Sequence, residues 1–433
     1  MSALAQTLLD RGARVTGSDR LFDAGGRPPV FETLRAAGAR LLPQDGSGVT
    51  AGVRAVVAST AVESGNADLD AAAERGVPIL HRAELLAKAV APSRVIAVAG
   101  TAGKTTVTAL IGFLLEQLGF DPVVINGGVA VDWDRRDRVG SVRAGSGGWS
   151  VVEADESDRS LLRFQPAWAV VTNISKDHFE RDEVRALFRT FAGQAREGVL
   201  APAATAAELA GAASFPITVA PAPEAVQSSG GGMEFLFRGH VCRLAMPGRH
   251  NADNAALALA YCVAVGADPA AAVAALARFR GVRRRLEIVG FVQGAAVIDD
   301  YAHNPAKIAA SWSAVSDSSA RVLGVWRPHG FGPLSLMFDE LAETFARVLR
   351  PQDRLFLLPV YYAGGTARGE RTSEDLAAAM RARGGAATTV RGYDELEPAI
   401  LREAGLGSTI LVMGARDPGL TDFCRRLAEA PTA

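Results

Sequence analysis

The sequence predicts an α/β protein built from three α/β domains in series. Short apolar runs alternate with helical stretches along the chain, which is typical of parallel sheets with helical crossovers. One of these runs, RVIAVAG at 94–100, is rich in β-branched residues, as buried parallel strands are. The length of 433 residues suits two to four domains of about 100–200 residues each.

The first segment, residues 1–92, ends at an expected linker, Pro92 and Ser93. Gly76 stops its clearest helical pattern. The expected strands of this segment lie at 13–18, 55–59 and 77–80, and the expected helix at 68–76.

The second segment opens with the strand at 94–100, and a Pro/Ser/Gly-rich stretch at 221–232 predicts a loop within it. Its other expected elements are strands at 149–154 and 167–173, and helices at 105–118, at 253–265 and after Pro269. The third segment begins near residue 286. Its expected elements are strands at 295–299, 321–326, 354–358 and 409–413, and helices at 305–315, 335–348, 373–383 and 421–429.

Composition excludes several classes of function. Lys and Arg number 46 against 47 Asp and Glu, so no basic excess points to nucleic acid. No apolar run reaches the roughly 18 residues of a membrane span, and the start does not resemble a signal peptide. Cys242, Cys262 and Cys424 are scattered, which predicts buried, reduced thiols in a cytoplasmic protein.

The motif GTAGKTT follows the strand at 94–100 and precedes a helix. Its glycines allow a tight turn whose N–H groups face phosphate oxygens, at the positive end of a helix dipole. Lys104 would neutralise the β- and γ-phosphates and the Thr105 hydroxyl would ligate Mg²⁺. Val98 stands where the general phosphate-loop pattern has glycine. The expected nucleotide contacts are Gly100, Thr101, Gly103, Lys104, Thr105 and Thr106.

Further motifs follow in order: VVEADESD at 151–158, TNISKDH at 172–178, GRHNADNAALA at 248–258, GVRRRLE at 281–287 and DDYAHNP at 299–305. Together with the phosphate loop they resemble the Mur ligases, the ATP-dependent amide-forming enzymes of peptidoglycan assembly. The N-terminal segment resembles the branch that adds L-alanine to UDP-N-acetylmuramate. The resemblance implies a Rossmann-like UDP-substrate domain at 1–92, an ATP-binding phosphate-loop domain at 93–285 and a Rossmann-like ligase domain at 286–433.

The acidic motif places Glu153 and Asp155 at the end of a strand, where open α/β sheets bind ligands. Spacing alone does not decide between Glu153 and Glu156 as a metal ligand. The resemblance implies that Glu153 ligates Mg²⁺ and that His178 helps to hold a second Mg²⁺. No lysine follows His178 within 179–198, so we expect no carbamylated lysine there.

The remaining candidates lie further along the chain. Asn251 and Asn254 share a helix face and suit an adenine edge, although N-capping is an alternative for Asn254. The resemblance implies that Arg285 contacts the γ-phosphate, and that Asp300 and His303 meet the nucleotide after domain closure. Arg283 and Arg284 receive no role.

The chain departs from the family pattern in two places. It begins at MSALA, directly after the position of the family's Gly-rich UDP loop, so we expect this sequence to lack the first strand and that loop. Two explanations stay open: further residues precede Met1, or UDP binding is lost. The arginine-rich stretch that meets the amino acid's carboxylate reads HGFGPLS at 329–335, without arginine. Poor use of L-alanine is therefore expected, unless Arg327 compensates.

The implied reaction uses ATP and Mg²⁺ to convert a UDP-linked muramate-type carboxylate into an acyl phosphate, which an amino acid or peptide amine then attacks. Lys104, Glu153, His178 and Arg285 would surround the transferred phosphoryl group. Two alternatives stay open: a murein tripeptide ligase of cell-wall recycling, which GVRRRLE resembles as well, and a non-catalytic nucleotide-binding homologue. We expect a monomer or homodimer without nucleic-acid or membrane partners.

Overall fold

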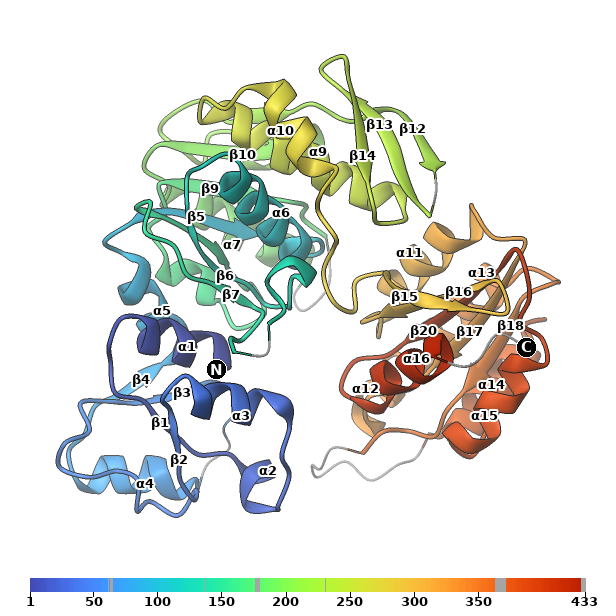
Figure 1. The fold of residues 1–433 in the computed structure, drawn as a ribbon, viewed down its shortest axis with the longest axis horizontal. Helices are drawn as coiled ribbons and strands as arrows, with labels where there is room; N and C mark the ends of the chain where they lie inside the picture. The colour runs from blue at the N-terminus through green and yellow to red at the C-terminus, as the bar shows by residue number, and fades with distance from the viewer. Residues whose placement is uncertain are drawn as a thin grey trace. The chain divides into compact units, whose positions relative to one another are not determined.

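The computed structural model describes residues 1–60, 62, 65–135, 137–175, 180–229, 231–362 and 371–429 (Figure 1). The chain forms two compact units. The first unit comprises Met1–Glu224, Leu236–Cys242 and Asp253–Arg280. The second unit comprises Ala225–Phe235, Arg243–Ala252 and Gly281–Ala433.

Residues 1–90 contain two small parallel strand pairs. β1 (Thr16–Gly17) pairs with β2 (Arg40–Leu41), and β3 (Val56–Ala58) pairs with β4 (Ile79–His81). The expected parallel pairing is confirmed, but the described strands form two separate sheets where one was expected. Strands of two or three residues share few backbone hydrogen bonds, and only small apolar clusters pack beside them. The helices are α1 (Ser2–Asp10), α2 (Arg20–Asp23), α3 (Pro29–Ala36), α4 (Ala67–Glu74) and α5 (Arg82–Val90).

A seven-stranded sheet forms the centre of the first unit, in the order β11-β10-β9-β5-β8-β6-β7. β5 (Arg94–Ala99) lies between β9 and β8, and all its residues after Arg94 are buried. These three strands are parallel, so the loops at their carboxyl ends meet at one edge of the sheet. The other strands are β6 (Val123–Ile125), β7 (Val142–Arg143), β8 (Trp149–Glu153), β9 (Trp168–Val171), β10 (Gly198–Pro202) and β11 (Thr218–Ala220).

Helix α6 (Lys104–Gln117) packs closely on this sheet. A Cβ at Gly112 would lie 2.6 Å from Val124 Cγ2, so only glycine fits at this contact. The helix expected at 105–118 is thereby confirmed, whereas the one expected from 253 begins earlier, at Arg249. The other helices of this region are η1 (Val131–Trp133), η2 (Ser160–Arg163), α7 (Arg181–Gly193), α8 (Ala203–Leu209), α9 (Arg249–Ala264) and α10 (Pro269–Leu276).

Three strands form a small separate sheet, β12 (Glu224–Ser229), β13 (Gly232–Phe237) and β14 (His240–Leu244). The loop predicted over 221–232 is therefore wrong at Glu224–Ser229. All but one of the residues of β12 are exposed, so this edge strand has polar side chains and no apolar alternation to mark it.

The second unit contains a six-stranded sheet in the order β15-β16-β20-β17-β18-β19. β15 is antiparallel to β16 and the other neighbours are parallel. The four strands predicted in this segment are confirmed, and the last of them, β20, lies between β16 and β17. The strands are β15 (Glu287–Val292), β16 (Ala295–Asp300), β17 (Arg321–Trp326), β18 (Arg354–Leu357), β19 (Thr388–Thr389) and β20 (Ser408–Met413).

Helices cover both faces of this sheet. Along β17, Val322 and Trp326 join one apolar cluster, while Leu323 and Val325 join another, as alternating strand residues do. The single helix predicted over 335–348 is wrong, because the non-helical backbone of Met337 separates two helices. The helices are α11 (Pro305–Ser316), α12 (Phe331–Leu336), α13 (Phe338–Val348), α14 (Ser373–Arg381), α15 (Tyr393–Leu401) and α16 (Gly419–Glu429).

Two expectations from composition can be compared with the structure. Cys242, Cys262 and Cys424 are buried and unbridged, as predicted. None of the helices in the described part of the chain has both the length and the apolar character that a membrane span needs.

Candidate active site

The GTAGKTT motif forms the turn between β5 and α6, at the carboxyl edge of the central sheet. Gly100 has a φ of +142°, and a Cβ there would lie 1.9 Å from Thr172 Oγ1. Gly103 has a φ of +83° and precedes the first residue of α6. Both positions therefore require glycine. Val98 belongs to β5 and is fully buried. The position at which this chain differs from the general phosphate-loop pattern therefore lies in the strand and not in the loop.

The carboxyl end of β9 holds this turn in shape. The Asn173 side chain accepts a hydrogen bond from the Ala102 N–H (3.0 Å) and donates one to the Ala102 carbonyl (2.9 Å). The Thr172 hydroxyl donates to the same carbonyl at 2.6 Å. Thr101 donates from its hydroxyl to the Ser175 carbonyl at 3.1 Å. Thr172 and Asn173 therefore act on the phosphate loop as positioning residues.

Lys104 lies beneath the loop. Its Nζ donates to the Gly100 carbonyl (2.8 Å) and to Glu156 Oε2 (2.6 Å), and it lies 3.7 Å from Asp155 Oδ1. Its side chain is only 13% exposed and that of Glu156 only 3%. Burial raises the pKa of Glu156 to about 7, against the opposing charge of Lys104. A carboxylate thus faces the lysine where the motif predicts phosphate.

Thr105, in the first turn of α6, faces Glu153 at the end of β8. The Thr105 hydroxyl donates to Glu153 Oε1 at 3.1 Å, and the Gly127 N–H donates to Glu153 Oε2 at 2.7 Å. Glu153 ends β8, in register with Val98 of β5, which directs it toward the loop. Of the two glutamates that spacing left open, Glu153 therefore adjoins Thr105, while Glu156 pairs with Lys104.

This hydroxyl and carboxylate suit Mg²⁺, which binds proteins through one or two carboxylates and takes its other ligands from phosphates and water. Across the described residues, no three His, Cys, Asp or Glu side chains converge into a complete metal cage. His178 lies outside the described residues. Thr105 and Glu153 are thus the described candidates for a metal that arrives with a nucleotide.

The two asparagines of α9 differ in their surroundings. Asn254 lies against the phosphate loop, since a Cβ at Gly103 would be 2.6 Å from its Oδ1. Asn251 is buried, and its amide donates to the Pro247 carbonyl at 2.7 Å, one turn before it. The structure therefore brings Asn254 to the loop, while the Asn251 amide supports the start of the helix.

In the second unit, Asp300 is the last residue of β16, and its carboxylate accepts hydrogen bonds from three donors of the same unit. Its carboxylate accepts the N–H groups of Leu286 (2.7 Å) and Ala302 (2.8 Å) and the Ser311 hydroxyl (3.0 Å). With 7% of the residue exposed, it fixes the turn around Arg285.

His303 follows three residues later. Its Nδ1 lies 2.9 Å from the Tyr301 carbonyl, which can only accept, so Nδ1 carries the proton and Nε2 is an acceptor. The ring centroids of His303 and His329 are 5.0 Å apart. Burial lowers the pKa of His303 to about 4, with Lys307 adding to the shift. Both burial and Arg416 lower the pKa of His329. Both imidazoles are therefore neutral near pH 7.

The three successive arginines have different partners. Arg283 forms an ion pair with Glu287. Arg284 donates to the carbonyls of Ala415 (2.8 Å) and Gly414 (2.6 Å). The Arg285 guanidinium lies over the Tyr301 ring, 5.2 Å from its centroid. Arg284 thus ties the segment before β15 to the loop after β20, beside the candidate Arg285.

Three family models match the chain in sequence order. They are the Mur ligase family catalytic domain at 1–94, the Mur ligase middle domain at 98–184 and the Mur ligase glutamate ligase domain at 284–416. The UDP-N-acetylmuramate–L-alanine ligase of Paracoccus denitrificans is 34% identical over 96% of this chain and 91% of its own. That of Sinorhizobium fredii is 33% identical over 96% of this chain and 92% of its own.

The chain belongs to the Mur ligase family. Mur ligases are ATP-dependent ligases, and the expected enzyme class is thereby confirmed. Among solved structures, the UDP-N-acetylmuramate–alanine ligase of Thermotoga maritima matches with a TM-score of 0.79 and 25% identity, over 99% of this chain and 96% of that one. The fold of a murein peptide ligase from Psychrobacter arcticus matches with a TM-score of 0.69 and 22% identity, over 100% and 97%. The predicted architecture of three α/β domains in series is confirmed.

The HGFGPLS stretch of this Mur ligase forms the start of α12, which begins at Phe331. Arg327, the suggested substitute for the missing arginines, is already engaged. Its guanidinium donates to Asp417 Oδ2 (2.5 Å) and to the Pro359 carbonyl (3.0 Å). A substrate carboxylate at Arg327 would have to displace a largely buried ion pair, which makes this arginine a poor substitute.

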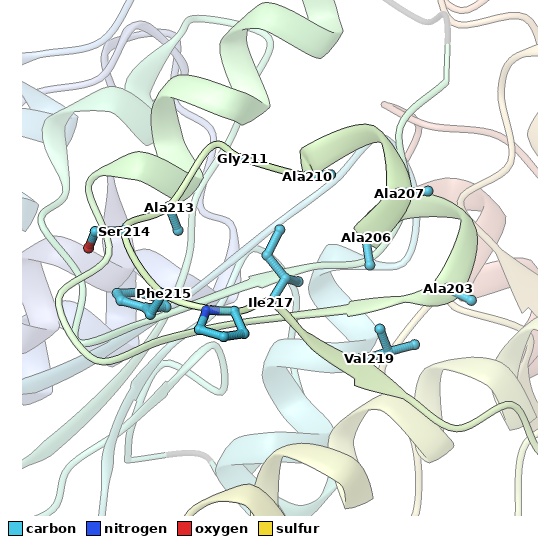
Figure 2. Close-up of a pocket in the computed structure, with 11 residues that line it drawn as sticks. Ala203, Ala206, Ala207, Ala210, Gly211, Ala213, Ser214, Phe215, Ile217 and Val219 are labelled. Carbon is cyan, nitrogen blue, oxygen red and sulfur yellow. The ribbon is translucent and has the colours of Figure 1, made fainter.

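A cavity of about 670 Å³ lies elsewhere in the Mur ligase, between α8 and the segment that leads to β11 (Figure 2). Its lining is apolar apart from Ser214 and includes Phe215, Ile217 and Val219. It contains no charged side chain and none of the predicted site residues, so it does not suit a nucleotide.

Sequence reasoning left two residues of these sites without a role. Glu156 was named only as a possible metal ligand, whereas it lies beyond the end of β8 and forms an ion pair with Lys104. Arg416 was not considered. It follows the predicted strand at 409–413, and a position just after a strand is the same signal that marked Glu153 and Asp155.

Proposed function

We propose that this Mur ligase joins UDP-N-acetylmuramate to L-alanine, at the expense of ATP. The observation that carries the proposal is the similarity to UDP-N-acetylmuramate–L-alanine ligases over 96% of the chain. The intact phosphate loop, in which Thr105 contacts Glu153 and Lys104 contacts Glu156, supports the ATP chemistry. The proposed domains are 1–92 for the UDP substrate, 93–285 for ATP and 286–433 for ligation, in a cytoplasmic protein.

The phosphate loop binds the nucleotide through its backbone N–H groups and the N-terminus of α6. Lys104 exchanges the Glu156 carboxylate for phosphate oxygens. Thr105 and Glu153 would hold Mg²⁺, which would supply positive charge to stabilise the phosphate oxygens. Asn254 lies against the phosphate loop at Gly103, close to the expected nucleotide. His178 is proposed to add a metal contact.

In the first chemical step, a carboxylate oxygen of the muramate attacks the γ-phosphorus and ADP leaves, which forms an acyl phosphate. Lys104 and Arg285 stabilise the charge on the transferred phosphoryl group. Asp300 acts indirectly, because its carboxylate fixes the turn that carries Arg285.

In the second step, the amine of L-alanine attacks the acyl carbon, the C–O bond to phosphate breaks, and the nitrogen loses a proton. A neutral imidazole with an acceptor nitrogen suits this proton. His303 meets this requirement, since its Nδ1–H is held by the Tyr301 carbonyl and its Nε2 is an acceptor.

The test is a ligation assay with ATP, Mg²⁺ and UDP-N-acetylmuramate, with either L-alanine or the murein tripeptide as amine. We expect ADP, phosphate and the alanyl product in equal amounts, identified by mass. Product from the tripeptide alone would support the recycling ligase, which the arginine-free α12 favours. Nucleotide binding without any amide would support the non-catalytic alternative.

A further inference from the structure

A Mur ligase that uses a free amino acid needs a cation for the carboxylate of that amino acid. A bidentate arginine is the usual solution. The 329–335 stretch has no arginine, and Arg327 is committed to Asp417. The inference below rests on the proposed function and concerns which residue binds this carboxylate.

Strand order brings three loops together at one edge of the C-terminal sheet. β20 lies between β16 and β17, and all three strands are parallel. The carboxyl end of β16 leads to His303, that of β17 to His329 and that of β20 to Arg416. Arg416 therefore lies on the loop between the two histidines, although it is distant from both in sequence.

The contacts at this edge agree with the strand order. The His303 and His329 rings are 5.0 Å apart, so the two outer loops meet there. Arg416 acts electrostatically on His329. Lys307 acts on both histidines and Arg285 on His303. The edge is therefore cationic and lined by imidazole acceptors, which suits a molecule with both a carboxylate and an amine.

The backbone on both sides of Arg416 is held in place. The carbonyls of Gly414 and Ala415 accept the Arg284 guanidinium. The Asp417 carboxylate accepts from Arg327, the Tyr393 hydroxyl and the Gly419 N–H. The Arg416 side chain is exposed between these two anchored neighbours, and no described acidic side chain forms an ion pair with it.

We propose that Arg416 binds the carboxylate of the amine substrate and supplies the guanidinium that the 329–335 stretch lacks. The carboxylate then lies beside Arg416, and the amine lies toward the acceptor nitrogen of His303. Arg416 sets substrate specificity in this arrangement. Under this proposal L-alanine is a good substrate, whereas the missing arginines alone predict poor use, so the two expectations differ in a measurable way.

The test compares L-alanine with L-alaninamide, which keeps the amine and lacks the carboxylate. For Arg416→Ala we expect the KM for L-alanine to rise roughly tenfold to hundredfold, as expected for one lost charge-assisted contact. The kcat/KM for L-alaninamide and the KM for ATP should stay within about twofold of the wild-type values. Arg416→Lys should restore part of the L-alanine affinity, because it keeps the charge without the fork.

Arg391→Ala is the matched control, because that side chain is 95% exposed and pairs with Glu395 on the adjoining helix. Its kinetics should equal those of the wild type, and all variants should melt at similar temperatures. Equal loss of L-alanine and L-alaninamide activity in Arg416→Ala, or no change in either, would overturn the role of Arg416. If the wild type ligates neither amine, the proposed function itself fails and the inference fails with it.

Discussion

The phosphate loop and the edge of the C-terminal sheet each contain a cation for an anionic substrate, but the two cations differ in burial and in ion pairing. Lys104 is 13% exposed and is paired with Glu156. Arg416 is exposed, and no described carboxylate pairs with it. A buried cation needs a counter-charge, whereas water solvates an exposed one. The comparison indicates that ATP must displace an internal carboxylate, while the amine substrate meets a cation that is already accessible.

The largest expected effect is at the buried cation. Lys104→Ala should reduce ATP turnover by about 10³-fold or more, because the charge on the transferred phosphoryl group loses its closest stabilising group. The fold should remain, since Glu156 can take up a proton once its partner is gone. ADP release and a thermal melt measure both effects.

Lys88→Ala is the control for this variant, because Lys88 is 61% exposed and pairs with Glu84 one turn earlier. It should turn over ATP at the wild-type rate. Near-normal turnover of Lys104→Ala, or loss of its folded state, would refute the assignment.

A smaller effect is expected at Thr105. Thr105→Val keeps the shape of the side chain and removes the hydroxyl beside Glu153. We expect the Mg²⁺ concentration for half-maximal activity to rise about tenfold, because the loss of one ligand contact costs about 1.4 kcal/mol, which corresponds to a factor of about ten.

Thr108→Val serves as the comparison, because Thr108 lies on the same helix, is fully buried and has no hydrogen-bond partner among the described residues. Its Mg²⁺ dependence should match that of the wild type. An unchanged Mg²⁺ dependence in Thr105→Val would exclude the hydroxyl from the metal site.

The smallest effect concerns Glu156 and pH. The folded-state pKa of this carboxyl is raised by burial to about 7, above its ordinary value of 4.5. Its stabilising contribution is therefore complete below about pH 4.5 and is lost as the pH rises through about 7. In Glu156→Gln nothing titrates at this position. The melting temperature of the wild type should thus fall relative to that of Glu156→Gln between pH 5 and 8, by a few degrees.

Glu84→Gln provides the opposite case, because a hydrogen bond from Lys88 lowers the pKa of Glu84. Its melting temperature should run parallel to that of the wild type over the same pH range. Parallel curves for Glu156→Gln as well would show that Glu156 does not titrate there.

The parts of the fold that the sequence predicted are those with a local signal. A pattern of only a few residues is enough to predict the glycine turn of the phosphate loop and the apolar strands β5, β8, β16, β17 and β20. β12 has no such signal, because an exposed edge strand is held only by backbone pairing. The break between α12 and α13 depends on the backbone of Met337, which no residue pattern marks.

In the candidate site, too, the residues with a local sequence signal were predicted and the others were not. Thr105 and Glu153 were predicted together and are in contact, since both are near the carboxyl ends of adjacent strands. The pairing of Lys104 with Glu156 was not predicted, because spacing does not show which way a loop carboxylate turns. Arg416 was missed because the last strand of the chain lies between two earlier ones, and that order cannot be derived from the sequence of the strands.

The central claim is that ATP activates the muramate carboxylate as an acyl phosphate before an amine attacks it. UDP-N-acetylmuramate with both carboxylate oxygens labelled as ¹⁸O tests this directly, in a reaction with ATP, Mg²⁺ and L-alanine. We predict that each inorganic phosphate released carries one ¹⁸O and that the amide product keeps the other. Unlabelled phosphate, with both labelled oxygens still on the muramate, would contradict the account.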